Sequence, residues 1–390
     1  MFAANYAVAL RDAGKLSEAL EMYDRAIALD PQNGSAYFDR AQIRLILGDY
    51  AGGWSDYEWR WRLPGMQMPR FKQPLWDGRV LPGRRLLLWP EQGFGDAVLS
   101  IRFAKYIRER VDKIILACKP ELVHLLDGVE GVDQLVPFSG ELPEFDVHCP
   151  LMTLPGFCVR DPARVPPPVR LTIPSEARAK AARLLAPAGK RLKVGIVWSG
   201  SVTFKSNHLR STSFERFLRL AELPDIQLFS LQKGPPAADL AARGTGVLVI
   251  DLGPSLNDFA DTAAVIESLD LVIMTDSAVA HLAGSLGKAV WNLVPFVAYW
   301  QYPHGRCDTP WYPSMRIFRQ PQPGDWDSVF EDVVRSLEHL VSTRRLSMQN
   351  AAIPKTFIGE SKLTRMPAPI AVDQSATGLG PSIITVSRPC

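Results

Sequence analysis

The sequence lacks the features that mark several large classes of protein. Its five cysteines form no CxxC pair and show no metal-ligand spacing, which indicates a reduced, cytosolic protein. The net charge is only +3, and without a dense Lys/Arg run no nucleic-acid partner is expected. Apolar runs stay below the roughly 18–20 residues of a transmembrane helix. The first residues, MFAANYAVALRDAGK, lack the order of a signal peptide. We therefore expect a cytoplasmic protein without a transmembrane segment.

An internal repeat with a period of 34 residues opens the chain. Residues of the first unit return in the second: Ala7 as Ala41, Gly14 as Gly48 and Tyr23 as Tyr57. Small alanines let paired helices approach closely, glycine forms the turn, and Pro31 stops the second helix. The pattern resembles tetratricopeptide repeats and predicts helices at about 2–14, 17–29, 35–47 and 50–62. Because two repeats are too few to stand alone, we expect them to pack on the domain that follows or to continue a longer array.

Composition and periodicity predict several domains in the 390 residues. We expect repeats in 1–62, a Pro- and Gly-rich linker in 63–84, an α/β domain in 85–165, a hinge in 166–192, a second α/β domain in 193–343 and a poorly ordered tail in 344–390. The first α/β domain should hold strands at 85–90, 114–117 and 135–137 and a helix at 97–110. The second should hold strands at 194–198, 227–231, 247–250, 271–275 and 289–293 and a last helix at 326–342. Such alternation predicts parallel sheets covered by helices.

The segment from Asp270 to Pro295 carries the clearest functional pattern. An apolar strand ends at Thr275, and Asp276 and Ser277 stand where the chain turns into a helix. Ligands of parallel sheets bind at such turns, and the free amides of a helix N-terminus favour phosphate. We therefore expect the amides of Ser277, Ala278 and Val279 to bind a diphosphate, while capping alone would also explain Asp276 and Ser277. From its position alone, His281 would more often be a buried structural histidine.

Two further segments offer charged or polar side chains at strand ends. Glu91 and Asp96 flank a glycine loop after the strand at 85–90, where Asp96 on spacing alone would be a helix cap. Lys205 and Arg210 follow the strand at 194–198 and could neutralise a diphosphate. The Asp-x-Asp at 325–327 precedes the last helix, so we interpret it as a cap and not as a metal site.

Several motifs together resemble the heptosyltransferase-like, family 9 glycosyltransferases, and most closely the bacterial group that fuses tetratricopeptide repeats to such a transferase. The resemblance covers about residues 5 to 340 and rests on DSxxxHLAGxLG at 276–287, YEWRWRL at 57–63, LWPEQGFGDAVLSIRF at 88–103, VGIVWSGS at 194–201, LQKG at 231–234 and TPWYPS at 309–314. It implies a GT-B type α/β fold with two Rossmann-like domains preceded by the helical repeats.

The resemblance also implies roles for individual residues. Asp96 matches the aspartate thought to be the catalytic base, with Glu91 as a neighbouring candidate. Further roles are implied for donor-diphosphate residues (Lys205, Arg210, Asp276, Ser277, Ala278, Val279 and His281) and for nucleotide-binding residues (Gln232 and Lys233). Arg306 and Trp311, with Tyr312, could line a sugar pocket or could equally be packing residues on a loop. No metal or other cofactor is required, and the nucleoside-diphosphate sugar is a co-substrate.

The expected function is transfer of a sugar from a nucleoside-diphosphate sugar to the hydroxyl of an acceptor. The acceptor could be a protein or a glycan or lipid-linked saccharide, and the repeats could bind a protein partner. One alternative is a non-catalytic binding protein with a degenerate transferase domain, which the unusual segment 300–307 favours. Another is a sugar-nucleotide epimerase on the same fold, which would need no acceptor.

Overall fold

The N-terminal repeats form paired antiparallel helices in the computed structural model, which describes residues 2–91, 93–242, 244 and 246–352. The helices are α1 (Phe2–Asp12), α2 (Leu16–Leu29), α3 (Gly34–Ile46) and α4 (Tyr50–Tyr57), followed by a 3-10 turn (Glu58–Arg62). Gly14 and Gly48 join the helices of each pair with φ of +75° and +89°, which glycine adopts without strain. Ala7, Ala19 and Ala41 are fully buried where helices cross. The expected helices are thus confirmed, although the last ends in a 3-10 turn.

A parallel sheet in the order β3-β2-β1-β4 follows the repeats. Its strands are β1 (Leu81–Trp89), β2 (Val111–Cys118), β3 (Gln134–Pro137) and β4 (Val147–Pro150). Strand β1 begins inside the segment expected to be a linker, and β4 was not predicted because its four residues carry no periodic signal. The helix expected at 97–110 is broken into α5 (Phe94–Ser100) and α6 (Ala104–Ile107), with 3-10 turns after each. At the break, buried Arg102 donates a hydrogen bond to the Leu99 carbonyl.

The second sheet is also parallel and has the order β10-β9-β8-β5-β6-β7. Its strands are β5 (Leu192–Val197), β6 (Ile226–Ser230), β7 (Val249–Asp251), β8 (Leu271–Thr275), β9 (Val290–Val294) and β10 (Met315–Arg319). The helices include α9 (Ser175–Leu185), α10 (Asn207–Arg210), α11 (Phe214–Ala221), α13 (Phe259–Ser268) and α14 (Ala278–Ser285). Apart from the edge strand β10, each strand was predicted to within a few residues, because fully buried parallel strands are continuous apolar runs.

The last helix, α15 (Trp326–Ala352), is longer than expected. The prediction of a tail beginning at 344 is therefore wrong for residues 344–352, and residues 353–390 lie outside the described part of the chain. Asp325 accepts hydrogen bonds from the Ser328 amide at 3.0 Å and from its hydroxyl at 2.8 Å, so it caps this helix as expected. Among the described residues, no helix is long and apolar enough to cross a membrane.

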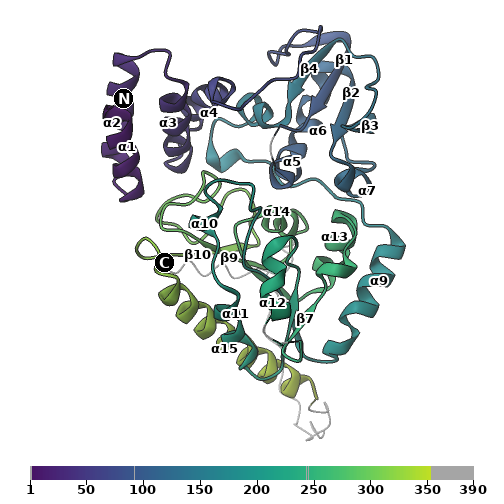
Figure 1. Cartoon of the computed structure of the whole chain (residues 1–390). Coiled ribbons are helices and arrows are strands. Elements are labelled where there is room, and N and C mark those ends of the chain that lie inside the picture. The colour runs from purple at the N-terminus through teal and green to yellow at the C-terminus, as the bar shows by residue number, and fades with distance from the viewer. Residues whose placement is uncertain (1, 92, 243, 245, 353–390) are drawn as a thin grey trace, which may run out of the picture.

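The repeats pack on both α/β units, as expected for a pair too small to stand alone (Figure 1). Trp54 of α4 contacts Trp300 of the second unit, with ring centroids 5.0 Å apart. Tyr50 accepts a 3.1 Å hydrogen bond from the indole of buried Trp311. Aromatic contacts of this kind contribute roughly 0.5–1.5 kcal/mol beyond the area they bury. The position of the repeats beside the α/β units is therefore fixed by a hydrophobic interface.

Candidate active site

A cavity of about 1170 Å³ lies where the repeats and the two α/β units meet. Side chains and backbone from all three parts line it. They include Arg11, Asp12, Phe38, Asp39, Gln42 and Ile46 of the repeats, Glu91, Phe94 and Asp96 of the first unit, and Ser199, Arg210, Asp276, Ser277, Tyr299 and Tyr302 of the second. The topology explains this meeting, because the carboxyl ends of parallel strands present their loops at one edge of each sheet.

Asp96 lies in the first turn of α5 and lines the cavity. One carboxylate oxygen, Oδ2, accepts a 2.9 Å hydrogen bond from the amide of Gly93, so the expected capping role is present. Burial raises the pKa of Asp96 to about 6, and the nearby carboxylates of Glu91 and Asp276 act in the same direction. The Gly93 amide and Arg210 oppose that shift. A carboxylate with a pKa close to neutral is a stronger base than an ordinary aspartate, and capping leaves Oδ1 for an acceptor proton.

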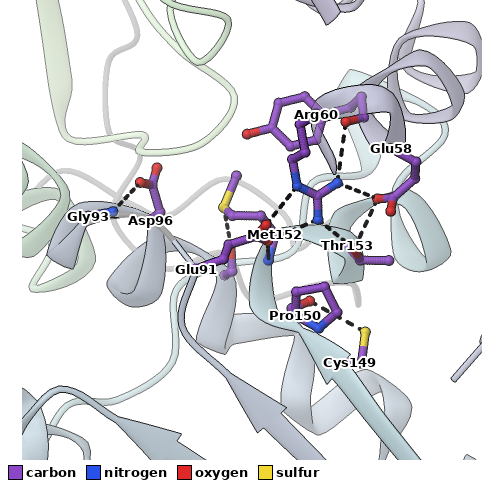
Figure 2. A network of polar contacts seen from close by, with 11 residues as sticks. Glu58, Arg60, Glu91, Gly93, Asp96, Cys149, Pro150, Met152 and Thr153 are labelled. Carbon is purple, nitrogen blue, oxygen red and sulfur yellow. Dashed lines mark hydrogen bonds and ion pairs between the residues drawn. The ribbon is translucent and has the colours of Figure 1, made fainter. Parts of the chain in front are cut away.

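Glu91 is held in a buried ion pair and is not placed to act as a base. Arg60 donates to its two oxygens at 2.7 and 3.0 Å, and the Met152 amide donates to Oε1 at 3.0 Å. The two side chains are 0% and 1% exposed, respectively. Figure 2 shows this network, in which the Asp96 carboxylate lies apart from that of Glu91. The structure therefore gives Glu91 a positioning role, in place of the catalytic one considered from the sequence.

The same network joins the end of the repeats to the first α/β unit. Arg60 donates to Glu58 and to Thr153, both at 2.8 Å, and the Thr153 hydroxyl donates to Glu58 at 2.9 Å. With Glu91, Glu58 and Thr153 as hydrogen-bond acceptors, the buried Arg60 guanidinium has the partners that a buried cation needs. The strand end that carries Glu91 and the loop that follows it are thereby tied to the repeats.

Arg210 faces the cavity from the second unit and is oriented by Asp276. Its Nη1 donates to Asp276 Oδ2 at 3.1 Å, and Tyr302 donates to the other oxygen, Oδ1, at 2.8 Å. Asp276 is buried, and the Arg210 guanidinium balances the charge of its carboxylate while the Tyr302 hydroxyl adds a hydrogen bond. The guanidinium keeps further N–H groups for an anion. Asp276 also lines the cavity, and its carboxylate orients Arg210; its expected contact with the diphosphate stays a prediction.

The N-terminus of α14 lines the cavity beside Arg210. Ser277 is the cap, and its hydroxyl accepts a hydrogen bond from the Val279 amide at 3.3 Å. That amide is engaged in the cap, and the phosphate role expected for it stays a prediction. The helix dipole still places partial positive charge at Ser277 and Ala278, where an anion is favoured.

His281 lies under the loop of the first unit and does not line the cavity. Its Nδ1 is 3.0 Å from the Tyr312 hydroxyl, and a methyl group added at Gly95 would come within 2.5 Å of its Cδ2. Burial lowers the pKa of His281 to about 4, so the imidazole is neutral near pH 7. The donor-binding role implied by the resemblance is thus replaced by packing between α5 and α14.

Other residues expected to bind the donor also have structural partners. Gln232 is buried: its Oε1 accepts from the amides of Trp198 and Ser199, and its Nε2 donates to the carbonyls of Ser199 and Lys233. Lys233 donates to the carbonyls of Gly253 and Leu256 at 2.9 and 2.7 Å. Both line the cavity, but their hydrogen bonds shape its loops.

Lys205 and the expected sugar-pocket residues lie outside the cavity lining. Lys205 is exposed on the loop before α10. Arg306 pairs with Asp308 at 2.6 Å, and Trp311, with Tyr312, is fully buried in the interface between the units and the repeats. None of these four side chains therefore lines the cavity in this structure.

Some lining residues were not predicted. Tyr302 belongs to the segment 300–307, whose departure from the family pattern hid its contact with Asp276. Phe94 of the first unit and Phe259 of the second meet across the cavity with ring centroids 4.7 Å apart. No sequence signal could have paired these rings, because the contact joins residues 165 positions apart, at the starts of helices α5 and α13 in different α/β units. Within the described part of the chain, no three His, Cys, Asp or Glu side chains are grouped as a metal site would require.

Comparisons with known proteins agree with the two parts of this architecture. Residues 8–48 match the family model of the TPR repeat. Tetratricopeptide repeat protein 36 of Bos taurus is 50% identical over 52 residues, which are 13% of this chain and 28% of that protein. Protein FlbA of Caulobacter vibrioides is 28% identical over 380 residues, 87% of this chain. The match spans 61% of FlbA, less than two thirds of its length.

A solved structure, the family 9 glycosyl transferase of Veillonella parvula, superposes with a TM-score of 0.51 at 14% sequence identity. The match covers 67% of this chain and 98% of that one, which shows a shared fold. The expected fold class and the resemblance stated from the motifs are confirmed. The chain carries tetratricopeptide repeats joined to two α/β units that together have the fold of a family 9 glycosyl transferase.

Proposed function

We propose that the protein transfers a sugar from a nucleoside-diphosphate sugar to an acceptor hydroxyl. One observation carries this proposal: Asp96 and Arg210 come from opposing α/β units and line the same cavity. A base on one side and a fixed cation on the other are the groups that glycosyl transfer to a hydroxyl requires. The shared fold with a family 9 glycosyl transferase supports this assignment.

Arg210 and the N-terminus of α14 would hold the donor diphosphate. Charge develops on the leaving diphosphate as its bond to the sugar breaks. The guanidinium, oriented by Asp276 at 3.1 Å, and the partial positive charge at Ser277 and Ala278 would stabilise that charge. Because these groups supply the positive charge, we propose that neither a metal nor a cofactor is required.

Asp96 would act as the general base on the acceptor. Its carboxylate takes the proton from the acceptor hydroxyl, and the oxygen forms a bond to the anomeric carbon. The bond from that carbon to the diphosphate oxygen breaks, and the nucleoside diphosphate leaves with the electron pair. Transfer to water by the same route would give slow donor hydrolysis.

The segment 300–307 supports an active enzyme over a degenerate binding protein. Its Tyr302 donates to Asp276 and so helps to fix Arg210 beside the cavity. An epimerase would have no need of an acceptor base, whereas the raised pKa of Asp96 suits that task.

A panel of ADP-, GDP- and UDP-sugars would test the proposal with the full chain. A true donor raises the melting temperature, because it binds the folded state only, and releases nucleoside diphosphate slowly in the absence of acceptor. The same release should continue in excess EDTA. If no nucleotide sugar at millimolar concentration stabilises the protein, the donor assignment is wrong; if EDTA stops the reaction, the metal-free part is wrong.

A further inference from the structure

Two phenylalanine rings from different α/β units meet in the cavity. Phe94 is the first residue of α5 and Phe259 is the first residue of α13, and both line the cavity. Their ring centroids lie 4.7 Å apart, with the ring planes tilted by 41°. Both residues are half-buried, so each keeps part of its aromatic surface open. Partly open aromatic rings in a cavity are typical of a site for a flat, apolar group of a ligand.

The strand order of the second sheet places this pair on one side of the candidate diphosphate site. Arg210 follows β5 and Ser277 follows β8, and the sheet continues from β5 to β6 and then to β7. Phe259 comes after β7. Two strand spacings separate the ends of β5 and β7 by about 10 Å, which a ribose and a base attached to the diphosphate can span. In the other direction, the segment after β9 packs on the repeats through Trp300.

We propose that the nucleobase of the donor stacks on the Phe94–Phe259 pair, so that both α/β units contribute to donor binding. The inference rests on the proposed function, which it deepens by assigning the part of the cavity that holds the base. Nucleobases are flat and aromatic, and stacking on an aromatic side chain suits each of them, because every base has a π-face. The two rings would therefore supply affinity with little selection among bases.

Asn257 offers a polar contact beside the rings. It lies two residues before Phe259, is exposed, and lines the cavity. Its backbone amide donates to Asp261 at 2.9 Å, whereas its side-chain amide has no hydrogen-bond partner among the described residues. A side-chain amide carries both donors and an acceptor, so it can pair with the edge of a base. Asn257 would therefore select among the bases that the rings accept.

Contacts within and between the units hold both rings in place. Asp258 caps α13 by accepting a 2.9 Å hydrogen bond from the Asp261 amide, and its other oxygen lies 2.8 Å from Nδ1 of His124 in the first unit. The ammonium of Lys119 lies 4.6 Å from the centroid of the Phe94 ring, which is a cation–π contact. A site that is ordered before the ligand arrives loses less entropy on binding.

The position of Phe94 also connects base binding to the candidate general base. Phe94 and Asp96 lie in the first turn of α5, two residues apart. A base held on Phe94 would fix the donor relative to Asp96, because one turn of one helix carries both side chains.

The test compares Phe94→Ala and Phe259→Ala with Phe2→Ala in the full chain. Phe2 is 84% exposed and lies outside the cavity lining, so it is a control for the loss of an aromatic ring. ADP, GDP and UDP are titrated by calorimetry, and inorganic pyrophosphate is the probe that lacks a base. Loss of either ring should weaken the binding of nucleoside diphosphates by about tenfold. Pyrophosphate binding should stay unchanged, and Phe2→Ala should bind all probes like wild type.

Two further variants separate stacking from a structural role. Phe259→Tyr keeps the aromatic ring and should bind nucleoside diphosphates like wild type. Asn257→Ala should narrow the differences in affinity among ADP, GDP and UDP, since it removes the group that pairs with the base edge. A purely structural role of the rings would instead weaken pyrophosphate binding as much as nucleotide binding.

The outcomes distinguish this inference from the proposed function. Nucleoside-diphosphate binding that is unchanged in both alanine variants, or that falls in parallel with pyrophosphate binding, overturns the inference alone. Ring-dependent binding in a chain that releases no nucleoside diphosphate from any nucleotide sugar supports the inference and contradicts the proposed function. If the wild-type chain binds none of the three nucleoside diphosphates, both are wrong.

Discussion

Arg60, at the end of the tetratricopeptide repeats, donates to both carboxylate oxygens of Glu91, at the end of the first strand of the α/β unit. The paired side chains are 0% and 1% exposed. Glu91 begins the loop that leads to Asp96, so a buried ion pair connects the repeats to the candidate catalytic base. The repeats are therefore part of the structure around the candidate active site and not a separate appendage.

Arg60→Met should destabilise the protein strongly. It leaves the Glu91 carboxylate buried without its partner, which typically costs about 3–5 kcal/mol. The double variant Arg60→Met/Glu91→Leu should recover much of that loss, since no buried charge remains. Urea denaturation measures both. As a control, Arg79→Met removes an exposed pair with Asp77 and should change stability by less than about 1 kcal/mol.

Asp96→Asn should abolish sugar transfer while donor binding stays near that of wild type. Asparagine can still accept the hydrogen bond from the Gly93 amide, so the helix cap survives. Because burial disfavours the Asp96 carboxylate, its removal should also raise the melting temperature by a few degrees at pH 7. Turnover and melting shifts with nucleotide sugars are the measurements. Retained turnover would remove Asp96 from the mechanism.

The rate should depend on pH through Asp96. The base must be deprotonated, and burial raises its pKa to about 6, so kcat/KM should fall as the pH drops through that value. The stability effect has the opposite sign: the folded state holds this proton more tightly, so the carboxyl becomes less favourable to folding as the pH rises from about 4 to about 6. Both effects are tested by measuring kcat/KM and the melting temperature between pH 4 and 8. If kcat/KM falls to half its maximum only near pH 4, the pKa of Asp96 is not raised.

Arg210 and Lys205 should behave differently although both are cations of the same loop region. Arg210→Met should raise the donor KM or lower kcat by about 100-fold, the usual effect of losing a group that stabilises developing charge. Lys205→Ala should change either value by less than about threefold, because Lys205 lies outside the cavity lining. Steady-state kinetics with a fixed acceptor make the comparison. Equal losses in both variants would mean that the loop closes over the donor.

Gly95→Ala should weaken the contact between the two α/β units. The new methyl group would lie 2.5 Å from His281 Cδ2 and 3.2 Å from the Ala278 Cα, so α5 and α14 must separate. Overpacking of this kind costs about 1–3 kcal/mol. Gly140→Ala is the matched control, since nothing lies within 4 Å of its Cβ position. The melting temperature and the turnover rate should both fall in Gly95→Ala and stay at the wild-type values in Gly140→Ala.

Patterns in the sequence predicted those helices and strands whose formation depends on residues close to one another in the chain. The 34-residue spacing of Gly14 and Gly48 predicted the helix pairs, and the apolar run 271–275 predicted a buried strand. Predictions were poorer where the signal is short or where a distant residue intervenes, as in strand β4 and in the helix broken near Arg102. The contacts of Glu91, His281 and Gln232 also depended on distant partners, so their motifs located the site but not their roles.

The sequence by itself determined the repeats, the parallel α/β units and the loops that meet at the cavity, because periodicity and turn chemistry act over a few residues. Only the tertiary structure decided which polar side chains remain for chemistry. Glu91 and Gln232 line the cavity but are occupied by partners from other segments, whereas Asp96 keeps one carboxylate oxygen and Arg210, paired with Asp276, keeps further N–H groups toward the cavity. That division depends on burial and on contacts between residues far apart in the chain, which set the pKa of a carboxyl and decide which polar groups already have a hydrogen-bond partner.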